Sequence, residues 1–236
     1  MTEGTAPAEK PRDLNVLICV PAHDRVNPGF AWSLARAMTF FATMPYDGNK
    51  KVDVTVVKSS NLAESRTILV SRAFTLGATH ILWADTDMKF PEDAIPALLN
   101  RSVPVVGVNY PTKDLVPRPT AYADNDDYIG PIWTGDNSEG LVEASHCGMG
   151  LLLTDTRVFE NMELPYFHFE PQGPDFIHTA TEDVYFCRKA RELGVKIYID
   201  HDLSKRCAHL GDFEYTNNMA KQAEIVKQEA YRELDK

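Results

Sequence analysis

Two aspartates, Asp85 and Asp87, follow the apolar residues 81–84 and are the side chains best placed to carry out chemistry. In an extended backbone, side chains two residues apart point the same way, so these two negative charges would face each other. Such a pair is stabilised when a cation or protons lie between the carboxylates. Carboxylate oxygens suit Mg²⁺ or Mn²⁺, and α/β sheets bind ligands at the carboxyl ends of their strands. The pair therefore predicts a metal site, with turn and helix-cap roles before Pro91 as the alternative.

A second acidic pair, Glu182 and Asp183, opens a segment with helical spacing that ends at Gly194. Thr179 stands three residues before Glu182, which is a capping-box pattern and would give Glu182 a purely local role. Neighbouring residues on a helix face different directions, so Asp183 could enter a cleft while Glu182 reaches back to the cap. These residues alone support the helix-cap and catalytic roles equally.

Five further features could contribute to a binding site. His209 follows the last expected strand and could complete a metal shell, although a lone histidine is more often a surface or core residue. Arg66 lies one turn into an expected helix, where it could reach a phosphate or remain solvated. Residues 21–24 follow the first strand, a usual place for a nucleotide contact, and residues 147–150 form a pliable turn. Trp133 could stack on a sugar or a base, or lie in the core.

The elements that would position these residues alternate between strand and helix over the first half of the chain. Short apolar runs rich in Val and Ile predict strands that are buried on both faces, at residues 15–20, 52–57, 80–84 and 103–108. Helical segments are expected between them, at residues 30–44, 62–76 and 91–100. This order predicts an α/β fold of right-handed βαβ units, with a mostly parallel central sheet and a Rossmann-like nucleotide-binding half.

The second half of the chain has a different pattern. Residues 110–140 are rich in Pro, Gly, Asp and Asn without periodicity, and a loop of that length in a compact domain is usually functional. Strands are expected at residues 141–145, 150–153 and 196–199, and a helix at 183–193. From Asn218 onward, apolar residues at helical spacing form a stripe that could pair with a second copy of the chain.

Composition limits the class of protein. The 236 residues suit one large domain, and 24 Lys and Arg against 34 Asp and Glu give a net charge of −10, which argues against coating nucleic acid or anionic lipid. The four cysteines form no CxxC pair, so neither a zinc module nor a disulfide scaffold is expected. No transmembrane segment or secretory signal is evident, so a cytoplasmic location is expected. We expect a disordered tail at residues 1–13, a single domain at 14–215 and a C-terminal helix at 216–236.

The order of the motifs is more informative than any one of them. Pro-Ala-His follows the first strand, Ser-Arg lies on the second helix, and Leu-Trp-Ala-Asp-Thr-Asp ends the third strand; Cys-Gly-Met-Gly, Thr-Glu-Asp-Val and His-x-Gly follow. This order resembles that of the GT-A-fold nucleotide-sugar glycosyltransferases, above all the compact bacterial and phage enzymes near the large family 2 group. The resemblance covers residues 14–211 and implies a loop-rich acceptor half after the nucleotide-binding half.

The resemblance implies roles for individual residues. Asp85, Asp87 and His209 would hold Mn²⁺ or Mg²⁺, with Asp87 the more direct ligand, and Asp183 beside Glu182 would deprotonate the acceptor if the enzyme inverts the anomeric centre. The residues implied to bind the nucleotide sugar, expected to be UDP-linked, are Pro21, Ala22, His23, Asp24, Arg66, Ala84, Asp85 and Thr86. The residues implied on the acceptor side are Trp133, Gly148, Met149 and Gly150. One departure is Thr67, because the family usually has Asn after this Arg.

The acceptor and two other functions stay open. A hydroxyl on a glycan, a lipid-linked glycan, a protein or a modified DNA base would serve as acceptor. A haloacid-dehalogenase-like Mg²⁺-dependent phosphatase also has an apolar strand before D-x-D, but its motif usually lies on the first strand and has Thr or Val where this chain has Lys89. A non-catalytic sugar-nucleotide-binding module that recruits a partner through the C-terminal helix is the other alternative.

Overall fold

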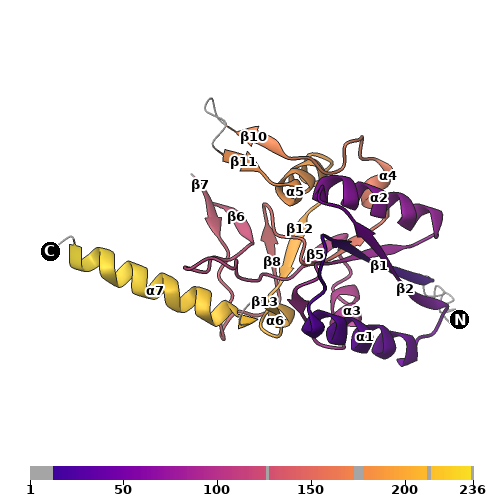
Figure 1. Ribbon diagram of the computed structural model, residues 1–236, viewed down its shortest axis with the longest axis horizontal. Coiled ribbons are helices and arrows are strands. Elements are labelled where there is room, and N and C mark those ends of the chain that lie inside the picture. Colours follow the sequence, from indigo (N-terminus) through magenta and orange to yellow (C-terminus); the bar gives the residue numbers. More distant parts are fainter. Residues whose placement is uncertain (1–12, 126–127, 173–177, 212–213, 235–236) are drawn as a thin grey trace, which may run out of the picture.

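Strands and helices alternate over the first half of the computed structural model, as the sequence predicts (Figure 1). The structure describes residues 13–125, 128–172, 178–211 and 214–234, so the expected tail falls outside the described residues apart from Asp13. The elements of the first half are β1 (Leu14–Ala22), α1 (Pro28–Thr43), β2 (Lys50–Lys58), α2 (Leu62–Thr75), β3 (His80–Ala84), β4 (Met88–Lys89), α3 (Ala94–Leu99) and β5 (Val105–Gly107).

The second half contains more short strands than the sequence predicts. Its elements are β6 (Tyr122–Asn125), β7 (Tyr128–Pro131), β8 (Leu141–Ala144), β9 (Leu151–Asp155), α4 (Arg157–Glu160), β10 (Glu170–Gln172), β11 (His178–Ala180), α5 (Glu182–Glu192), β12 (Ile197–Asp200), α6 (His201–Ser204), β13 (Ala208–Leu210), β14 (Glu214–Tyr215) and α7 (Asn217–Leu234). The expectation of an irregular loop at residues 110–140 is wrong in part, because β6 and β7 pair there as an antiparallel hairpin. Each strand has only four residues, YADN and YIGP, which is too short for a clear alternation of apolar and polar residues.

Seven strands form the central sheet, in the order β2-β1-β3-β9-β5-β12-β8. β2, β1, β3, β5 and β12 run in one direction, whereas β9 and β8 run antiparallel to their neighbours. The expected α/β fold with a mostly parallel sheet is therefore confirmed, and the architecture is compatible with a GT-A-like fold. The parallel strands end at a common carboxyl edge, where ligands of α/β sheets bind.

Helices cover both faces of the sheet, which explains why its strands are apolar without alternation. In β1, Val16 and Ile18 belong to the core cluster that includes residues of α1 and α3, whereas Leu17 and Cys19 belong to the cluster that includes residues of α2, α4 and α5. Figure 1 shows α1 and α3 on one side of the sheet and α2 and α5 on the other. Side chains alternate along a strand, so burial on both faces requires consecutive apolar residues.

The last helix, α7, starts at the carboxyl edge of the sheet and extends away from it (Figure 1). The side-chain amide of Asn217 donates to the carbonyls of Asn109 and Ser204 at 2.9 and 3.1 Å and fixes the start of the helix. Further along, Val226 of the expected apolar stripe is exposed, and pairing of this stripe with a second copy stays a prediction, as does the division into one domain and a terminal helix. Among the described helices, none combines the length and apolar character needed to cross a membrane.

An ion pair holds the end of β12 against the end of α3. Arg101 donates to both carboxylate oxygens of Asp200, at 2.8 and 2.9 Å, and the same carboxylate caps α6 by accepting from the amide of Leu203 at 3.0 Å. Asp200 is only 1% exposed, whereas Asp202, which also accepts from Arg101, has a side chain 47% exposed. The buried carboxylate therefore fixes the segment that leads to His209.

Replacing Asp200 by Ala should lower the free energy of unfolding by about 3 kcal/mol, because Arg101 loses its buried partner and α6 loses its cap. Asp202→Ala is the matched control, since it also removes a contact with Arg101 but at an exposed carboxylate, and should cost less than about 1 kcal/mol. Urea unfolding of both variants, followed by circular dichroism, measures the difference. If both variants lost the same free energy of unfolding, the buried ion pair of Asp200 would be no more stabilising than the exposed contact of Asp202, and the prediction would be wrong.

Candidate active site

The turn after β3 carries the two aspartates to the carboxyl edge of the sheet. Asp85 leaves the strand, its carbonyl accepts from the amide of Met88 at 3.1 Å, and the chain then enters β4. β4 pairs antiparallel with β13, which sets Met88 opposite His209, and the amide of Leu210 donates to the carbonyl of Asp87 at 2.7 Å. Backbone pairing between two short strands thus brings together Asp87 and His209, as the metal hypothesis requires.

The imidazole of His209 is oriented toward Asp87. Its Nδ1 lies 2.9 Å from the carbonyl oxygen of Pro111, and because a carbonyl only accepts, Nδ1 carries the proton. Its Nε2 lies 3.5 Å from Oδ1 of Asp87, and the ring of Tyr110 packs edge-on against it at 5.2 Å. Donation of one ring N–H to a backbone carbonyl fixes the orientation of the other nitrogen, as is common in metal-binding histidines, and here that nitrogen faces Asp87.

The residues present fit a hard divalent cation. Asp87 and His209 offer one oxygen and one nitrogen, and Mg²⁺ or Mn²⁺ commonly binds one or two protein ligands and completes its shell with water and phosphate oxygens. Within the described part of the chain, no group of three or more His, Cys, Asp and Glu side chains is arranged to hold a metal by itself. Asp85 in turn has one oxygen engaged by Arg66. The three-residue metal set therefore stays a prediction.

Asp87 also contacts a cation of the protein itself, because the ammonium of Lys113 bonds to its Oδ2. Partial burial raises the pKa of Asp87, but hydrogen bonds from His209 and Lys113 outweigh it and lower the pKa to about 2. The carboxylate is therefore ionised across the physiological range and is available to a cation at any pH where the protein is folded.

Arg66 is buried beneath the site, between the two acidic pairs. Its Nη2 donates to Asp85 at 3.2 Å and its Nε to Glu182 at 3.1 Å, while the guanidinium lies 5.5 Å from the centre of the Trp83 ring. Its Nη1 is buried, and within the described residues it has no hydrogen-bond partner. Burial lowers the pKa of Arg66, but the charges of Asp85, Glu182 and Asp183 outweigh it and raise the pKa above its ordinary value.

The position of Arg66 differs from the one the sequence predicts. A residue that meets a phosphate or a nucleoside would reach the surface, whereas Arg66 is only 1% exposed. Its two carboxylate partners, Asp85 and Glu182, come from the end of β3 and the start of α5. Arg66 therefore connects the expected metal ligands to the segment that carries the expected base, Asp183. Contact with a donor stays a prediction, and the structure supports a positioning role.

Glu182 and Asp183 stand at the start of α5 but not in a capping box. The N-cap residue is Thr181, so the spacing between Thr179 and Glu182 does not match the helix start, and the capping-box interpretation is wrong. Glu182 is buried and reaches Arg66, and burial raises its pKa although Arg66 lowers it. Asp183 is half-buried, and its Oδ1 accepts from the hydroxyl of Thr181 and from the amide of Val184 at 2.8 Å.

Tyr110 lies between the two acidic sides of the site. Burial raises the pKa of its hydroxyl well above the ordinary value, and the charges of Asp85 and Asp183 add to this increase. The hydroxyl accepts from the amide of Gly150 at 2.9 Å. A Cβ on Gly148 would lie 2.4 Å from this hydroxyl and one on Gly150 2.7 Å from the ring, so the glycines make room for Tyr110. A role for them against the acceptor stays a prediction.

Of the residues expected to follow the first strand and hold the nucleoside, Pro21 and Ala22 are instead the last two residues of β1, and the loop after them lies beside the turn after β3. The amide of Asn27 donates to the carbonyl of Thr86 at 2.9 Å and ties the two loops together. His23 and Asp24 are exposed and lie 3.3 Å apart, whereas Ala84 is buried. The two segments assigned to the nucleotide sugar are thus neighbours at one edge, although their contact with a donor is untested.

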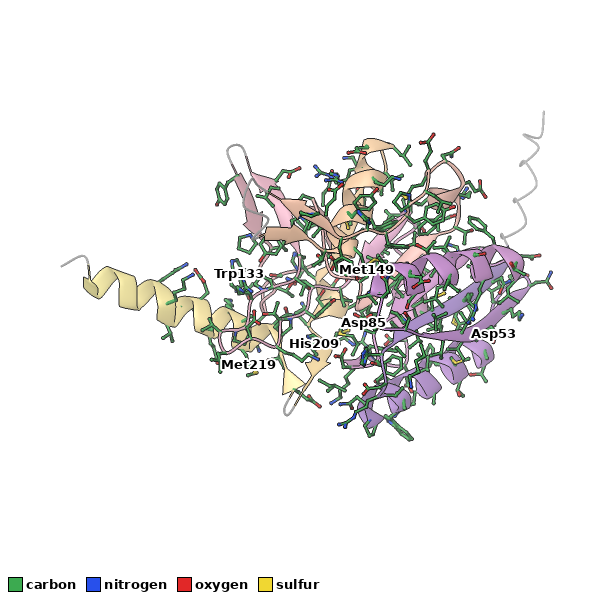
Figure 2. All side chains as sticks on the ribbon, turned by 45° about the horizontal axis from the view of Figure 1, so that its top comes forward. Asp53, Asp85, Trp133, Met149, His209 and Met219 are labelled. Atoms are coloured by element: carbon green, nitrogen blue, oxygen red, sulfur yellow. The ribbon has the colours of Figure 1, made fainter. Side chains whose placement is uncertain are left out.

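Trp133 lies on another flank of the molecule, toward α7 (Figure 2). It lines a groove of about 830 Å³, whose other lining residues are Asp114, Leu115, Val116, Pro117, Arg118, Pro119, Tyr122, Pro131, Glu224 and Lys227. Tyr122 stacks on His146 at 4.9 Å. Burial lowers the pKa of His146, and the negative charge of Asp183 opposes this decrease. Met149, in contrast, is buried.

Sequence reasoning missed Tyr110, Lys113 and His146. A signal for Tyr110 existed, because it follows β5, whose carboxyl end shares the edge with β3. No local pattern marks Lys113 or His146, which reach the site through contacts between segments distant in the sequence. Figure 2 shows Asp85, Met149 and His209 in the middle of the molecule, with Asp53 on β2 at its far side.

One solved structure shares the fold of this chain, and a second aligns less well. The structure of A197 from STIV aligns with a TM-score of 0.55 at 16% identity and covers 84% of this chain and 86% of that one. A nucleoside-diphosphate-sugar pyrophosphorylase from Vibrio cholerae RC9 aligns with a TM-score of 0.46 at 9% identity, over 88% of this chain and 98% of that one. At 16% identity the likeness to A197 is one of fold. No protein-family model and no curated protein sequence matches the chain.

Replacing Arg66 by Met should lower the free energy of unfolding by about 4 kcal/mol at neutral pH, because it leaves two largely buried carboxylates without their counter-ion. The carboxyl groups of Asp85 and Glu182 would then have pKa values above those of the unfolded chain. The loss should therefore grow as the pH rises through these folded-state pKa values and shrink toward the ordinary carboxyl pKa of about 4.

Urea unfolding at several pH values measures this dependence. Arg72→Met, on the exposed side of the same helix, is the matched control and should show a small loss. A loss for the Arg66 variant that stays constant between neutral and acidic pH would refute the charge assignment, because a packing defect alone does not titrate.

Proposed function

We propose that the chain is a metal-dependent glycosyltransferase that moves a sugar from a nucleoside-diphosphate donor, expected to be a UDP-sugar, to a hydroxyl acceptor. The observation that carries the proposal is the meeting of two acidic groups at one edge of the sheet: Asp87 beside His209, and Asp183 on α5, with buried Arg66 joining their neighbours. Such a transfer needs both a site for the diphosphate and a base for the acceptor, and this edge offers candidates for each.

Asp87 and His209 would hold Mn²⁺ or Mg²⁺, with Asp85 near the metal waters or the ribose. A bound divalent cation would act as a Lewis acid and stabilise the charge that builds on the leaving diphosphate. The segment after β1 and the turn at Thr86 would hold the nucleoside, because their backbones are joined at this edge.

Asp183 would act as the base on the acceptor side. Its Oδ1 is held by Thr181 and by the amide of Val184, which leaves Oδ2 to face the acceptor hydroxyl. As the bond between the anomeric carbon and the donor phosphate oxygen breaks, its electron pair leaves with the nucleoside diphosphate. The acceptor oxygen forms the new bond to the anomeric carbon, and its proton passes to Asp183. Attack from the face opposite the leaving group would invert the anomeric centre.

The groove beside Trp133 is the proposed acceptor side. It is lined by the half-buried ring of Trp133 and by the exposed side chains of Leu115 and Val116, and Tyr122 at its edge stacks on His146, whose pKa the charge of Asp183 influences. Aromatic faces of this kind bind sugar rings or bases without fixing the identity of the acceptor.

Replacing Asp183 by Asn should lower kcat at least about 100-fold, because the base is lost, while Mn²⁺-dependent UDP binding stays within about twofold of the natural chain. Replacing Asp87 by Asn should instead abolish the Mn²⁺-dependent part of UDP binding. Asp53→Asn is the control for both, because this exposed side chain lies on β2, far from the edge (Figure 2). Thermal shift with and without Mn²⁺ measures binding, and UDP release from a panel of UDP-sugars measures turnover.

The same assays separate the alternatives. Phosphate release from a general phosphate ester, without cleavage of any nucleotide sugar, would replace the proposal with a phosphatase. Mn²⁺-dependent UDP binding that no donor or acceptor converts to turnover, together with unchanged binding by the Asp183 variant, would support a binding module.

A further inference from the structure

Lys113 sits where a metal ion would be expected at Asp87. Its ammonium bonds to Oδ2 of Asp87 and also reaches the carbonyl of Leu210 at 3.4 Å. The other carboxylate oxygen of Asp87 faces Nε2 of His209 at 3.5 Å. A cation of the protein thus already occupies one side of the carboxylate that the proposed metal would use.

The loop that carries Lys113 is fixed at its base. Pro111 and Pro119 form a β-bridge, and the amide of Thr112 donates to the carbonyl of Arg118 at 2.7 Å. Arg118 also pairs with Asp114 at 2.8 Å. These contacts fix the loop, so that Lys113 lies next to Asp87.

The same loop orients the other proposed ligand. The carbonyl of Pro111, two residues before Lys113, accepts from Nδ1 of His209 and sets the direction of Nε2. One loop therefore aligns His209 for a cation and places a competing charge on Asp87. This arrangement gives Lys113 a function in the metal-free protein, because the ionised carboxylate has a counter-ion before any metal arrives.

Lys113 is also able to leave. Its side chain is 36% exposed, and a lysine ammonium is a strongly hydrated charge on a flexible stem. An ion pair at this exposure contributes little to stability, so a divalent cation can replace it. The freed ammonium would stay on the same loop, close to phosphate oxygens that bind such a cation.

We propose that Lys113 is a resident counter-ion of Asp87, which a divalent cation displaces and which then pairs with the diphosphate of the donor. The proposal rests on the proposed function, since it requires the metal site at Asp87 and His209. In this proposal, Lys113, on the loop between β5 and β6, contributes to binding of the donor. When the metal binds, the ammonium of Lys113 moves from Asp87 toward the diphosphate leaving group.

A nearby lysine offers a matched control. Lys89 lies two residues after Asp87 on β4, and its ammonium pairs with Glu214 at 2.5 Å. Its side chain carries the same charge and is 50% exposed, against 36% for Lys113. Removing Lys89 therefore changes the charge near the site without removing a contact to Asp87, which separates direct competition from a general electrostatic effect.

The first test uses Mn²⁺ alone, with the free ion followed by electron paramagnetic resonance. Lys113→Met should bind Mn²⁺ roughly fivefold more tightly than the natural chain, because the competing cation is gone, whereas Lys89→Met should change the affinity by less than about twofold. Asp87→Asn should lose the site. Equal changes in the two lysine variants, or no change in Lys113→Met, would overturn the role of Lys113 while leaving the metal site in place.

The second test adds UDP at saturating Mn²⁺. Lys113→Met should now bind UDP several-fold more weakly, opposite in sign to its effect on Mn²⁺, and Lys113→Arg should restore most of the loss. Unchanged UDP binding in Lys113→Met would overturn the transfer of its charge to the diphosphate. Mn²⁺ binding that survives in Asp87→Asn would overturn the proposed metal site itself, so the two failures are distinguishable.

Discussion

One buried cation, Arg66, holds the candidate site together. Transfer of a guanidinium out of water costs several kcal/mol, and the cost is offset only if the charge is neutralised and its donors are bonded. Here Asp85, at the end of β3, and Glu182, at the start of α5, supply the opposing charges and accept from Nη2 and Nε, while the face of Trp83 covers the guanidinium. Nη1 has no hydrogen-bond partner among the described residues, so the cost of burial is only partly offset. Because each carboxylate belongs to a different element, satisfying Arg66 fixes the position of α5 relative to the turn after β3. The positions of Asp87 and Asp183 follow from that constraint.

The charges at this edge do not balance. Four carboxylates, those of Asp85, Asp87, Glu182 and Asp183, stand against the cations of Arg66 and Lys113 and the imidazole of His209, so acidic groups outnumber basic groups at this edge. Like charges held close in a partly desolvated site destabilise it unless protons or cations neutralise them. The raised pKa of Glu182, caused first by burial, is one response to this excess. A divalent cation bound at Asp87 would be another.

Elements marked by a run of apolar residues in their own sequence could be predicted. Elements that depend on pairing with a strand far along the chain mostly could not. β1 to β3 and their helices follow from apolar runs buried on both faces and from the turn residues between them. The antiparallel insertion of β9 and the pairing of β4 with β13 depend on partners far along the chain, which no local pattern encodes. The same holds for the residues of the site. The acidic pairs could be recognised from their spacing in the sequence, whereas the partners of Arg66 and the contact of Lys113 with Asp87 could not.

The loop after β5 joins the two sides of the site through Tyr110. Its buried hydroxyl accepts from the amide of Gly150, and its ring packs on His209, so the turn before β9 and the end of β13 rest on the same side chain. The glycine contacts leave no space for a Cβ at Gly148 or Gly150, and the loop cannot shift without moving that turn. Because the next residues orient His209 and carry Lys113, any movement of the loop would alter the metal side and the approach to Asp183 together. The tight packing of one tyrosine is therefore what would couple cation binding at one end of the site to the geometry at the other.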